Sequence, residues 1–138
     1  MSLNFSKEWF KVIKLICYSS KTLHIKETHH SYVGEKGFTT IKVIAANEID
    51  GHKLSDLQVD LHIKRGIYDD CIPLSLTNYM ETNEAEILLE DKYTSYEGTI
   101  GFYLQFSKTS QNPERNIIGK TNAVYIDVIN NIKTEEEM

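Results

Sequence analysis

Residues 56–64 alternate strictly between polar and apolar side chains, and this alternation constrains the fold more than any other feature of the sequence. The apolar members are Leu57, Val59, Leu61 and Ile63, and a polar residue follows each of them. In a β-strand, a period of two places the two kinds of side chain on opposite faces, which no helix would do. The stretch therefore predicts a half-buried strand with His62 on its polar, exposed face.

Several other stretches carry strand patterns, and turn signals separate them. The clear ones cover residues 39–46, 84–90, 99–107 and 122–129, and weaker ones cover 12–18, 22–26 and 66–72. Residues 19–21 are expected to form a hairpin loop, Asp50-Gly51 is a turn signal, and Asn112-Pro113 breaks the chain. Short strands without a long helical period predict an all-β fold, either a β-sandwich or a barrel.

The length of 138 residues fits one domain of ordinary size. We expect an N-terminal lead-in, a single β-sandwich domain and a disordered acidic tail, at residues 1–10, 11–130 and 131–138 respectively. Residues 4–18 leave two interpretations open, because Phe5, Trp9 and Val12 would also share one face of a helix. The favoured interpretation is a short helical or extended lead-in followed by a strand.

The charge and cysteine content exclude several classes of protein. A net charge of −5 argues against a general nucleic-acid binder, which is normally basic overall. Cys17 and Cys71 form no Cys-x-x-Cys pair, so we expect free, buried thiols in a protein that is made in the cytoplasm. Lys11 and Lys14 interrupt the one apolar run that could resemble a signal peptide, and no run approaches the ~20 residues of a membrane span.

Charge is unevenly distributed along the chain. Residues 1–42 contain seven lysines and three glutamates, whereas residues 43–138 contain eight basic and seventeen acidic side chains. Solvated faces of opposite sign are the simpler interpretation of this difference. The alternative is head-to-tail complementarity between neighbouring subunits, in which opposite patches fix the register.

The sequence contains no recognisable metal-binding or phosphate-binding motif. Its histidines include no i, i+4 pair and no His-Glu-x-x-His, and Gly119-Lys120-Thr121 lacks the upstream glycine of a phosphate-binding loop. A zinc site from His24, His29 and His30 would require a hairpin to bring the three side chains together. We therefore expect no metal and no cofactor.

Acidic side chains are the remaining candidates for catalysis. Glu84, Glu86 and Glu90 fall among apolar residues in a strand pattern, which places them on its wet side. A glycosidase needs two carboxylates in a cleft, one of them with its pKa raised by burial. The pattern favours a solvated strand face, and we expect no enzymatic activity.

Aromatic side chains are the best candidates for a binding function. Tyr103 lies on the face of its strand opposite the apolar residues, and Tyr125 does so in the strand at 122–129. Tyrosine and tryptophan are enriched at protein interfaces. Tyr103, Tyr125 and Trp9 are therefore the predicted interface residues.

Three stretches share their order and spacing with a known family of domains. Residues 38–44 (Phe-Thr-Thr-Ile-Lys-Val-Ile) and 49–55 (Ile-Asp-Gly-His-Lys-Leu-Ser) give a strand, an Asp-Gly turn and the entry to a further strand. Residues 95–106 combine a small-residue turn, an acidic-Gly pair and a long aromatic strand, and residues 120–128 give a closing strand. Over roughly residues 38–130 the chain resembles the immunoglobulin-like or baseplate-upper-protein N-terminal-like domains of tailed-phage structural proteins.

The resemblance implies an antiparallel, immunoglobulin-like β-sandwich of about seven or eight strands. Such a domain has no enzymatic activity, assembles with other virion proteins and forms a symmetric homo-oligomer. The tryptophans common near the last two strands of such domains are missing, and we expect no fibre or receptor-binding module after the domain. We therefore expect a small structural or adaptor protein of the tail, baseplate or collar, made in the host cytoplasm and located in the virion, without nucleic-acid or membrane partners. A small ligand- or carbohydrate-binding β module is the alternative, and a hydrolase with a carboxylate pair ranks third.

Overall fold

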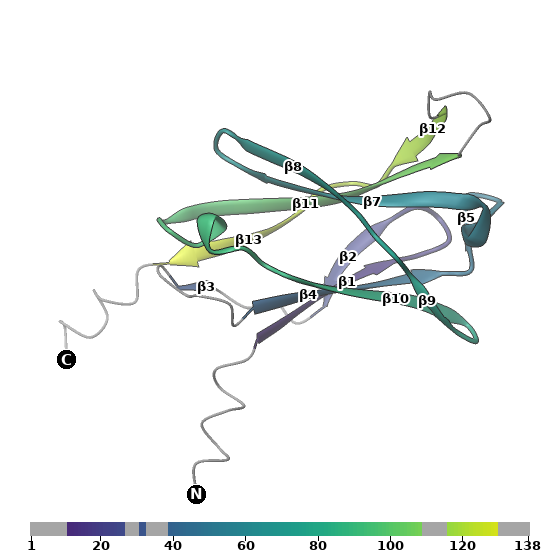
Figure 1. The fold of residues 1–138 in the computed structure, drawn as a ribbon, viewed down its shortest axis with the longest axis horizontal. Coiled ribbons are helices and arrows are strands. Elements are labelled where there is room, and N and C mark those ends of the chain that lie inside the picture. Colours follow the sequence, from purple (N-terminus) through teal and green to yellow (C-terminus); the bar gives the residue numbers. More distant parts are fainter. Residues whose placement is uncertain (1–10, 27–30, 33–38, 109–115, 130–138) are drawn as a thin grey trace, which may run out of the picture.

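Two β-sheets stack face to face and enclose the core between them (Figure 1). The computed structural model describes residues 11–26, 31–32, 39–108 and 116–129. The first sheet has the strand order β2-β1-β4-β10-β9. Its strands are β1 (Lys11–Cys17), β2 (Leu23–Lys26), β4 (Thr39–Ala46), β9 (Thr77–Tyr79) and β10 (Thr82–Leu88).

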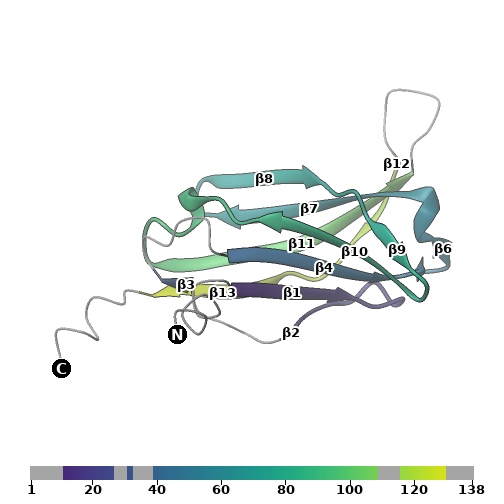
Figure 2. The same cartoon turned by 60° about the horizontal axis from the view of Figure 1, so that its bottom comes forward.

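The second sheet has the strand order β3-β13-β11-β7-β8, and β12 also pairs with β11. Its strands are β3 (Ser31–Tyr32), β7 (Leu57–Arg65), β8 (Tyr68–Pro73), β11 (Gly98–Lys108), β12 (Asn116–Lys120) and β13 (Val124–Ile129). The remaining elements are a small hairpin and two 3-10 turns, namely β5 (Glu48–Ile49), β6 (His52–Lys53), η1 (Leu54–Asp56) and η2 (Asp91–Tyr93). Figure 2 shows β10, β4 and β1 of the first sheet side by side. The predicted all-β sandwich is confirmed.

The predicted alternation gives β7 its buried face. Val59, Leu61 and Ile63 are almost completely buried. The neighbouring strand β11 and the first-sheet strands β1 and β4 supply the facing side chains, which are Ile100, Phe102, Leu104, Phe106, Ile13, Leu15, Ile41 and Val43. Burying one such side chain contributes roughly 1.5–3 kcal/mol relative to leaving it exposed. The core therefore lies between the central strands of the two sheets.

Two tight turns have the backbone geometry that their residues favour. Asp50-Gly51 joins β5 to β6 with φ angles of 51° and 83°, as expected for an Asp-Gly pair in a type I′ hairpin. Gly66, with φ of 56°, and Ile67 join β7 to β8. The strand predicted at 66–72 therefore begins later, at Tyr68, because the glycine forms the turn.

The strand pairing departs from a purely antiparallel sandwich at two places. β1 pairs with β4 in parallel, from Lys11 opposite Thr39 to Cys17 opposite Ala45. The two-residue β3 likewise pairs in parallel with β13. β1 and β2 form the predicted hairpin, and β3 in the second sheet comes between β2 and β4 in the sequence. A parallel pair requires such a crossover, because a tight turn can join only antiparallel neighbours.

Besides the two-residue strands β3, β5 and β6, two longer strands have no counterpart among the sequence predictions. β9 is exposed at all three of its residues and so shows no alternation of apolar and polar side chains. β12 pairs with β11 through a bulge between Phe106 and Ser107, which interrupts any period of two. The strand predicted at 84–90 is present as β10 but begins and ends two residues earlier.

Between β12 and β13, the side chains of Thr121 and Asn122 make hydrogen bonds to the backbone of neighbouring strands. The strand predicted at 122–129 therefore begins two residues later, at Val124. The backbone N–H of Thr121 donates to the carbonyl of Leu104 at 2.9 Å, and its Oγ1 accepts from the Leu104 N–H at 3.0 Å. Oδ1 of Asn122 accepts from the backbone N–H of Leu23 at 2.8 Å, and Nδ2 donates to the Leu23 carbonyl at 2.9 Å. We call this pair of hydrogen bonds the Asn122 clasp, and it ties β2 of the first sheet to the second sheet.

Several predicted segments lie outside the described residues. These are the lead-in at 1–10, the tail at 131–138 and the Asn112-Pro113 break. Residues 4–18 could be read from the sequence as a helix or as a lead-in followed by a strand. Of the described residues in this segment, Lys11–Cys17 form a strand and not a helix. In the part of the chain that the structure describes, no helix has the length and apolar character needed to cross a membrane.

Candidate functional site

The outer face of the second sheet carries both of the tyrosines predicted to lie at an interface. Tyr103 lies opposite His62 on β7, and Tyr125 lies opposite Gly101 on the other side of β11. Directly opposed residues share one face of a sheet, so Tyr103 and Tyr125 are near neighbours on this face. We call this surface the aromatic face, and it comprises Tyr103, Tyr125, His62, Lys64, Asp69 and Lys120.

Tyr125 is the most exposed aromatic side chain of this face, at 61%. Its ring lies over Gly101, where an added Cβ would come within 3.0 Å of the Tyr125 Cε1 atom. Because glycine has no side chain, the ring can rest against the backbone of the neighbouring strand. One face of the Tyr125 ring therefore packs against the backbone at Gly101, and the rest of the side chain is exposed to solvent.

Tyr103 is packed more tightly than its neighbour. Its ring stacks on His62 with centroids 4.5 Å apart and planes inclined by 5°, and the Lys120 ammonium lies 5.6 Å from the ring centroid. Burial raises the pKa of the Tyr103 hydroxyl, and the nearby Asp69 and Cys71 raise it further. The hydroxyl therefore stays protonated at neutral pH and can donate a hydrogen bond.

His62 is not the exposed side chain that the alternation predicted. Its side chain is only 14% exposed, because the ring of Tyr103 covers one of its faces. Nδ1 lies 3.8 Å from the Asp69 carboxylate, and Nε2 is buried without a hydrogen-bond partner among the described residues. Trp9, the third predicted interface residue, lies outside the described residues.

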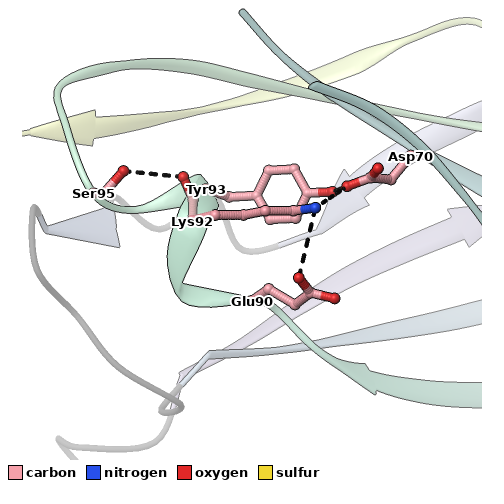
Figure 3. A network of polar contacts seen from close by, with 5 residues as sticks. All are labelled: Asp70, Glu90, Lys92, Tyr93 and Ser95. Carbon is pink, nitrogen blue, oxygen red and sulfur yellow. Dashed lines mark hydrogen bonds and ion pairs between the residues drawn. The ribbon is translucent and has the colours of Figure 1, made fainter. Parts of the chain in front are cut away.

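A second polar cluster joins β8 to η2 (Figure 3). The Tyr93 hydroxyl donates to Asp70, and the Lys92 ammonium lies 2.7 Å from the same carboxylate and 3.7 Å from Glu90. The Ser95 hydroxyl donates to the Lys92 carbonyl at 3.1 Å. The hydrogen bond to Asp70 raises the pKa of Lys92. Because Asp70 is engaged by two partners from η2, this cluster fixes η2 against β8.

Of the three glutamates considered for catalysis, Glu84 and Glu86 line the same hollow and Glu90 lies apart from them. Glu84 pairs with Lys42 at 3.0 Å, and this hydrogen bond raises the pKa of the lysine. Glu86 and Glu90 are exposed, and Glu90 lies beyond the end of β10. A glycosidase acid requires an apolar environment that retains its proton, whereas Glu84 has an ammonium group beside it. This arrangement gives no support to a hydrolase with a carboxylate pair.

The described residues line several hollows that no sequence pattern predicts, including two next to the strand pair of β9 and β10. The first, of about 310 Å³, lies over the Lys42–Glu84 pair and includes the exposed Tyr79. The second, of about 250 Å³, lies between η1 and the connection from β8 to β9. We call the second one the end pocket, and its lining includes Leu54, Leu57, Val59, Leu74, Leu76 and Asn83.

Three asparagines form a hydrogen-bonded cluster beside the end pocket. Nδ2 of Asn78 donates to Oδ1 of Asn47 at 3.1 Å and to Oδ1 of Asn83 at 3.0 Å. Nδ2 of Asn83 donates to Oδ1 of Asn47 at 2.9 Å. Nδ2 of Asn47 donates to the Met80 carbonyl at 2.9 Å, which fixes the turn between β9 and β10. The three residues come from separate segments, so their cluster has no recognisable sequence motif.

Among the described residues neither Cys17 nor Cys71 forms a disulfide, and only Cys17 is buried as predicted. Burial raises the pKa of Cys17 to about 12. The prediction for Cys71 is wrong, because this thiol lies on the outer side of the edge strand β8 and is exposed. His24 is exposed on β2, and His29 and His30 lie outside the described residues. Over the described ranges, no three His, Cys, Asp or Glu side chains form a group that could hold a metal ion.

Comparison with known proteins gives a likeness of fold. Neither a protein-family model nor a curated protein sequence matches the chain. Among solved structures, the N-terminal domain of phage TP901-1 ORF48 matches with a TM-score of 0.51 and 11% sequence identity. The match covers 86% of this chain and 96% of that one. The expected resemblance to a phage domain is therefore confirmed at the level of the fold.

Proposed function

We propose that this chain is a non-enzymatic structural or adaptor protein of a phage virion, in the tail, baseplate or collar, and that it acts through protein–protein assembly. The observation that carries this proposal is the likeness of fold to the N-terminal domain of phage TP901-1 ORF48, which extends over 96% of that chain. The partners are other virion proteins and further copies of the chain itself.

The aromatic face is the surface that we assign to the contact with other virion proteins. Tyr125 offers exposed apolar area, and Tyr103 offers a fixed ring with a protonated hydroxyl. Tyrosine gives a large contact area at a low cost in conformational entropy. Lys64 and Asp69, which lie opposite each other on β7 and β8, supply both signs of charge, and charge complementarity favours one register with a partner.

Incorporation into particles tests the proposal directly. Phage particles from a strain that encodes the chain are purified on a density gradient and probed with an antibody raised against the recombinant chain. We expect the chain to band with the particles at a fixed ratio to the capsid protein, and gold-labelled antibody to decorate the tail and not the head. A chain that remains in the supernatant, or that bands only with host proteins, contradicts the proposal.

Two tyrosine substitutions test the aromatic face in the same particles. Tyr125→Ala removes the exposed ring, and Tyr18→Ala, in the turn between β1 and β2, is the matched control. Truncating an interface anchor typically costs about 2 kcal/mol or more, which weakens binding roughly 30-fold. We expect Tyr125→Ala to lower incorporation and Tyr18→Ala to leave it unchanged. Equal incorporation of the two variants would remove the aromatic face from the proposal.

A small ligand- or carbohydrate-binding β module is the second candidate, and the hollow of about 310 Å³ favours it. The exposed ring of Tyr79 lies beside the Lys42–Glu84 ion pair, so a sugar ring could stack on the tyrosine while the charged groups bind its hydroxyls. Calorimetric titration with a panel of bacterial cell-wall oligosaccharides tests this. We expect binding that Tyr79→Ala abolishes and Tyr18→Ala preserves. No heat with any oligosaccharide at millimolar concentration rejects this candidate.

A further inference from the structure

The outer face of the first sheet carries aliphatic side chains where a solvated face would be polar. Buried residues alternate along β1 and β4, so Val12, Ile16 and Ile44 project from the side of the sheet that faces away from the core. Leu88 of β10 lies on the same side and is 56% exposed. By contrast, β7 of the second sheet has polar residues at the positions that alternate with its core side chains. We call the outer side of β1, β4 and β10 the first-sheet face.

The side chains of the first-sheet face lie in three rows across adjacent strands (Figure 2). In order along β1, the rows are Val12–Thr40–Leu88, Lys14–Lys42–Glu86 and Ile16–Ile44–Glu84. Aliphatic side chains of the first and third rows therefore flank a charged middle row. The first and third rows are four residues apart along the strand, which is roughly 13 Å. A group that covers this face needs two apolar parts at that spacing and a polar part between them.

The composition of β1 and β4 also indicates a covered face. An antiparallel sheet with one solvated face gives a clean alternation of apolar and polar residues, whereas strands buried on both faces read as near-continuous apolar runs. β1 is apolar at every position except its two lysines, and β4 has consecutive apolar residues on the C-terminal side of Lys42. The two strands pair in parallel, and parallel sheets commonly have both faces covered.

The segment at 1–10, outside the described residues, has the pattern that this face requires. Phe5 and Trp9 are four residues apart, and polar residues, Lys7 among them, separate them. The segment ends where β1 begins, at Lys11, so Trp9 can reach only the first row. Phe5 is six residues from Lys11 and can lie up to about 20 Å away, which includes the third row. A chain that turns back near Lys11 therefore places Trp9, Lys7 and Phe5 over the first, second and third rows.

Other occupants fit this face less well. A separate partner would have to compete with a tethered segment, whose effective concentration is on the order of millimolar. The remaining stretches outside the described residues include 27–30, 109–115 and 130–138, which are mostly polar. Residues 33–38 join β3 of the second sheet to β4 of the first and are therefore held at both ends. The segment at 1–10 is both apolar and attached to the strand that it would cover.

We propose that residues 3–10 pack over the first-sheet face of their own chain, with Trp9 over the Val12 row and Phe5 over the Ile16 row. This packing goes beyond the proposed function and does not depend on it. Trp9 then lies on the opposite side of the sandwich from the aromatic face and makes a contact within the chain. The first-sheet face is closed to partners, and assembly with other virion proteins uses the second sheet.

Fluorescence of the full chain tests this packing, because Trp9 is its single tryptophan. We expect acrylamide to quench the native protein several-fold less than the protein unfolded in urea. Leu88→Lys places a charge in the first row, and Phe5→Ser removes the second apolar group of the segment, so each should raise quenching several-fold. Ile117→Lys, at an exposed aliphatic position of β12, is the matched control and should leave quenching unchanged. Circular dichroism confirms that each variant is folded.

Dilution identifies which chain supplies the segment. A tethered segment has an effective concentration on the order of millimolar, so quenching should stay constant from about 0.1 to 100 µM protein. Shielding that disappears on dilution shows that a second copy supplies the contact and overturns the packing within one chain. Native quenching equal to that in urea, or shielding that neither Leu88→Lys nor Phe5→Ser reduces, overturns it as well. None of these results depends on whether the chain bands with phage particles, so the proposed function stands or fails separately.

Discussion

Replacing Asn122 by alanine removes the clasp that holds β2 against the second sheet. Asn122→Ala eliminates the hydrogen bonds of 2.8 and 2.9 Å to the backbone of Leu23. Each such bond contributes about 0.5–1.5 kcal/mol, so the loss of both is about 1–3 kcal/mol. Asn122 itself is exposed, and water can take over part of its role, which puts the expected loss at about 1–2 kcal/mol. In a chain of 138 residues this lowers Tm by about 3–8 °C.

Urea and thermal unfolding followed by circular dichroism measure this loss, with an unchanged denaturant m-value. Asn116→Ala is the matched control, because Asn116 is exposed on β12 and takes no part in the clasp. Asn122→Asp keeps an acceptor for the Leu23 N–H but sets a carboxylate against the Leu23 carbonyl, so it should destabilise at least as much as alanine. A free energy of unfolding for Asn122→Ala within about 0.3 kcal/mol of the wild type would refute the reasoning.

Three further predictions concern the aromatic face, the η2 cluster and the thiols. Gly101→Val should cost about 1–3 kcal/mol in urea unfolding, because even a Cβ at this position would come within 3.0 Å of the Tyr125 ring; an unchanged free energy would contradict the packing. The hydrogen bond to Asp70 raises the pKa of Lys92 above its ordinary value, so the stabilisation from this pair is present at neutral pH and disappears as pH rises through the folded-state pKa. The Tm values of wild type and Lys92→Met should therefore differ at neutral pH and converge in strong alkali, and a constant difference would argue against the ion pair. A thiol reagent followed by mass spectrometry should modify the exposed Cys71 in the native protein and Cys17 only in urea, whereas equal rates would contradict the burial.

Strands with a period of two could be predicted almost to their bounds, because the period follows from burial of one face alone. β4 occupies the predicted residues 39–46, and β7 is displaced from the predicted 56–64 by a single residue. β9 and β12 are short, and pairing with β10 and β11 is what defines them. The parallel pairing of β1 with β4 could not be predicted from the sequence either. Alternation of apolar and polar residues indicates which face of a strand is buried, but not which strand lies beside it.

The aromatic face could be predicted only in part. Alternation within each strand placed Tyr103 and Tyr125 on polar faces, but their proximity depends on the register between β11 and β13. The exposure of His62 and Cys71 was misjudged, because it depends on which neighbours cover them. Tyr103 covers His62, whereas Cys71 lies on an edge strand. The end pocket is built from distant segments and has no local pattern at all.

The parallel pairing of β1 with β4 has a consequence for how the chain folds during synthesis. β1 has no strand on that side until Ala46 has been synthesised, and the Asn122 that clasps Leu23 follows it by 99 residues. Folds dominated by such distant contacts form in about milliseconds to seconds, not in microseconds. The β1 edge of the hairpin is therefore open until β4 has been synthesised, and open edges pair readily with other chains. We expect expression at higher temperature to lose soluble protein through this nascent hairpin, well below the melting temperature of the finished domain.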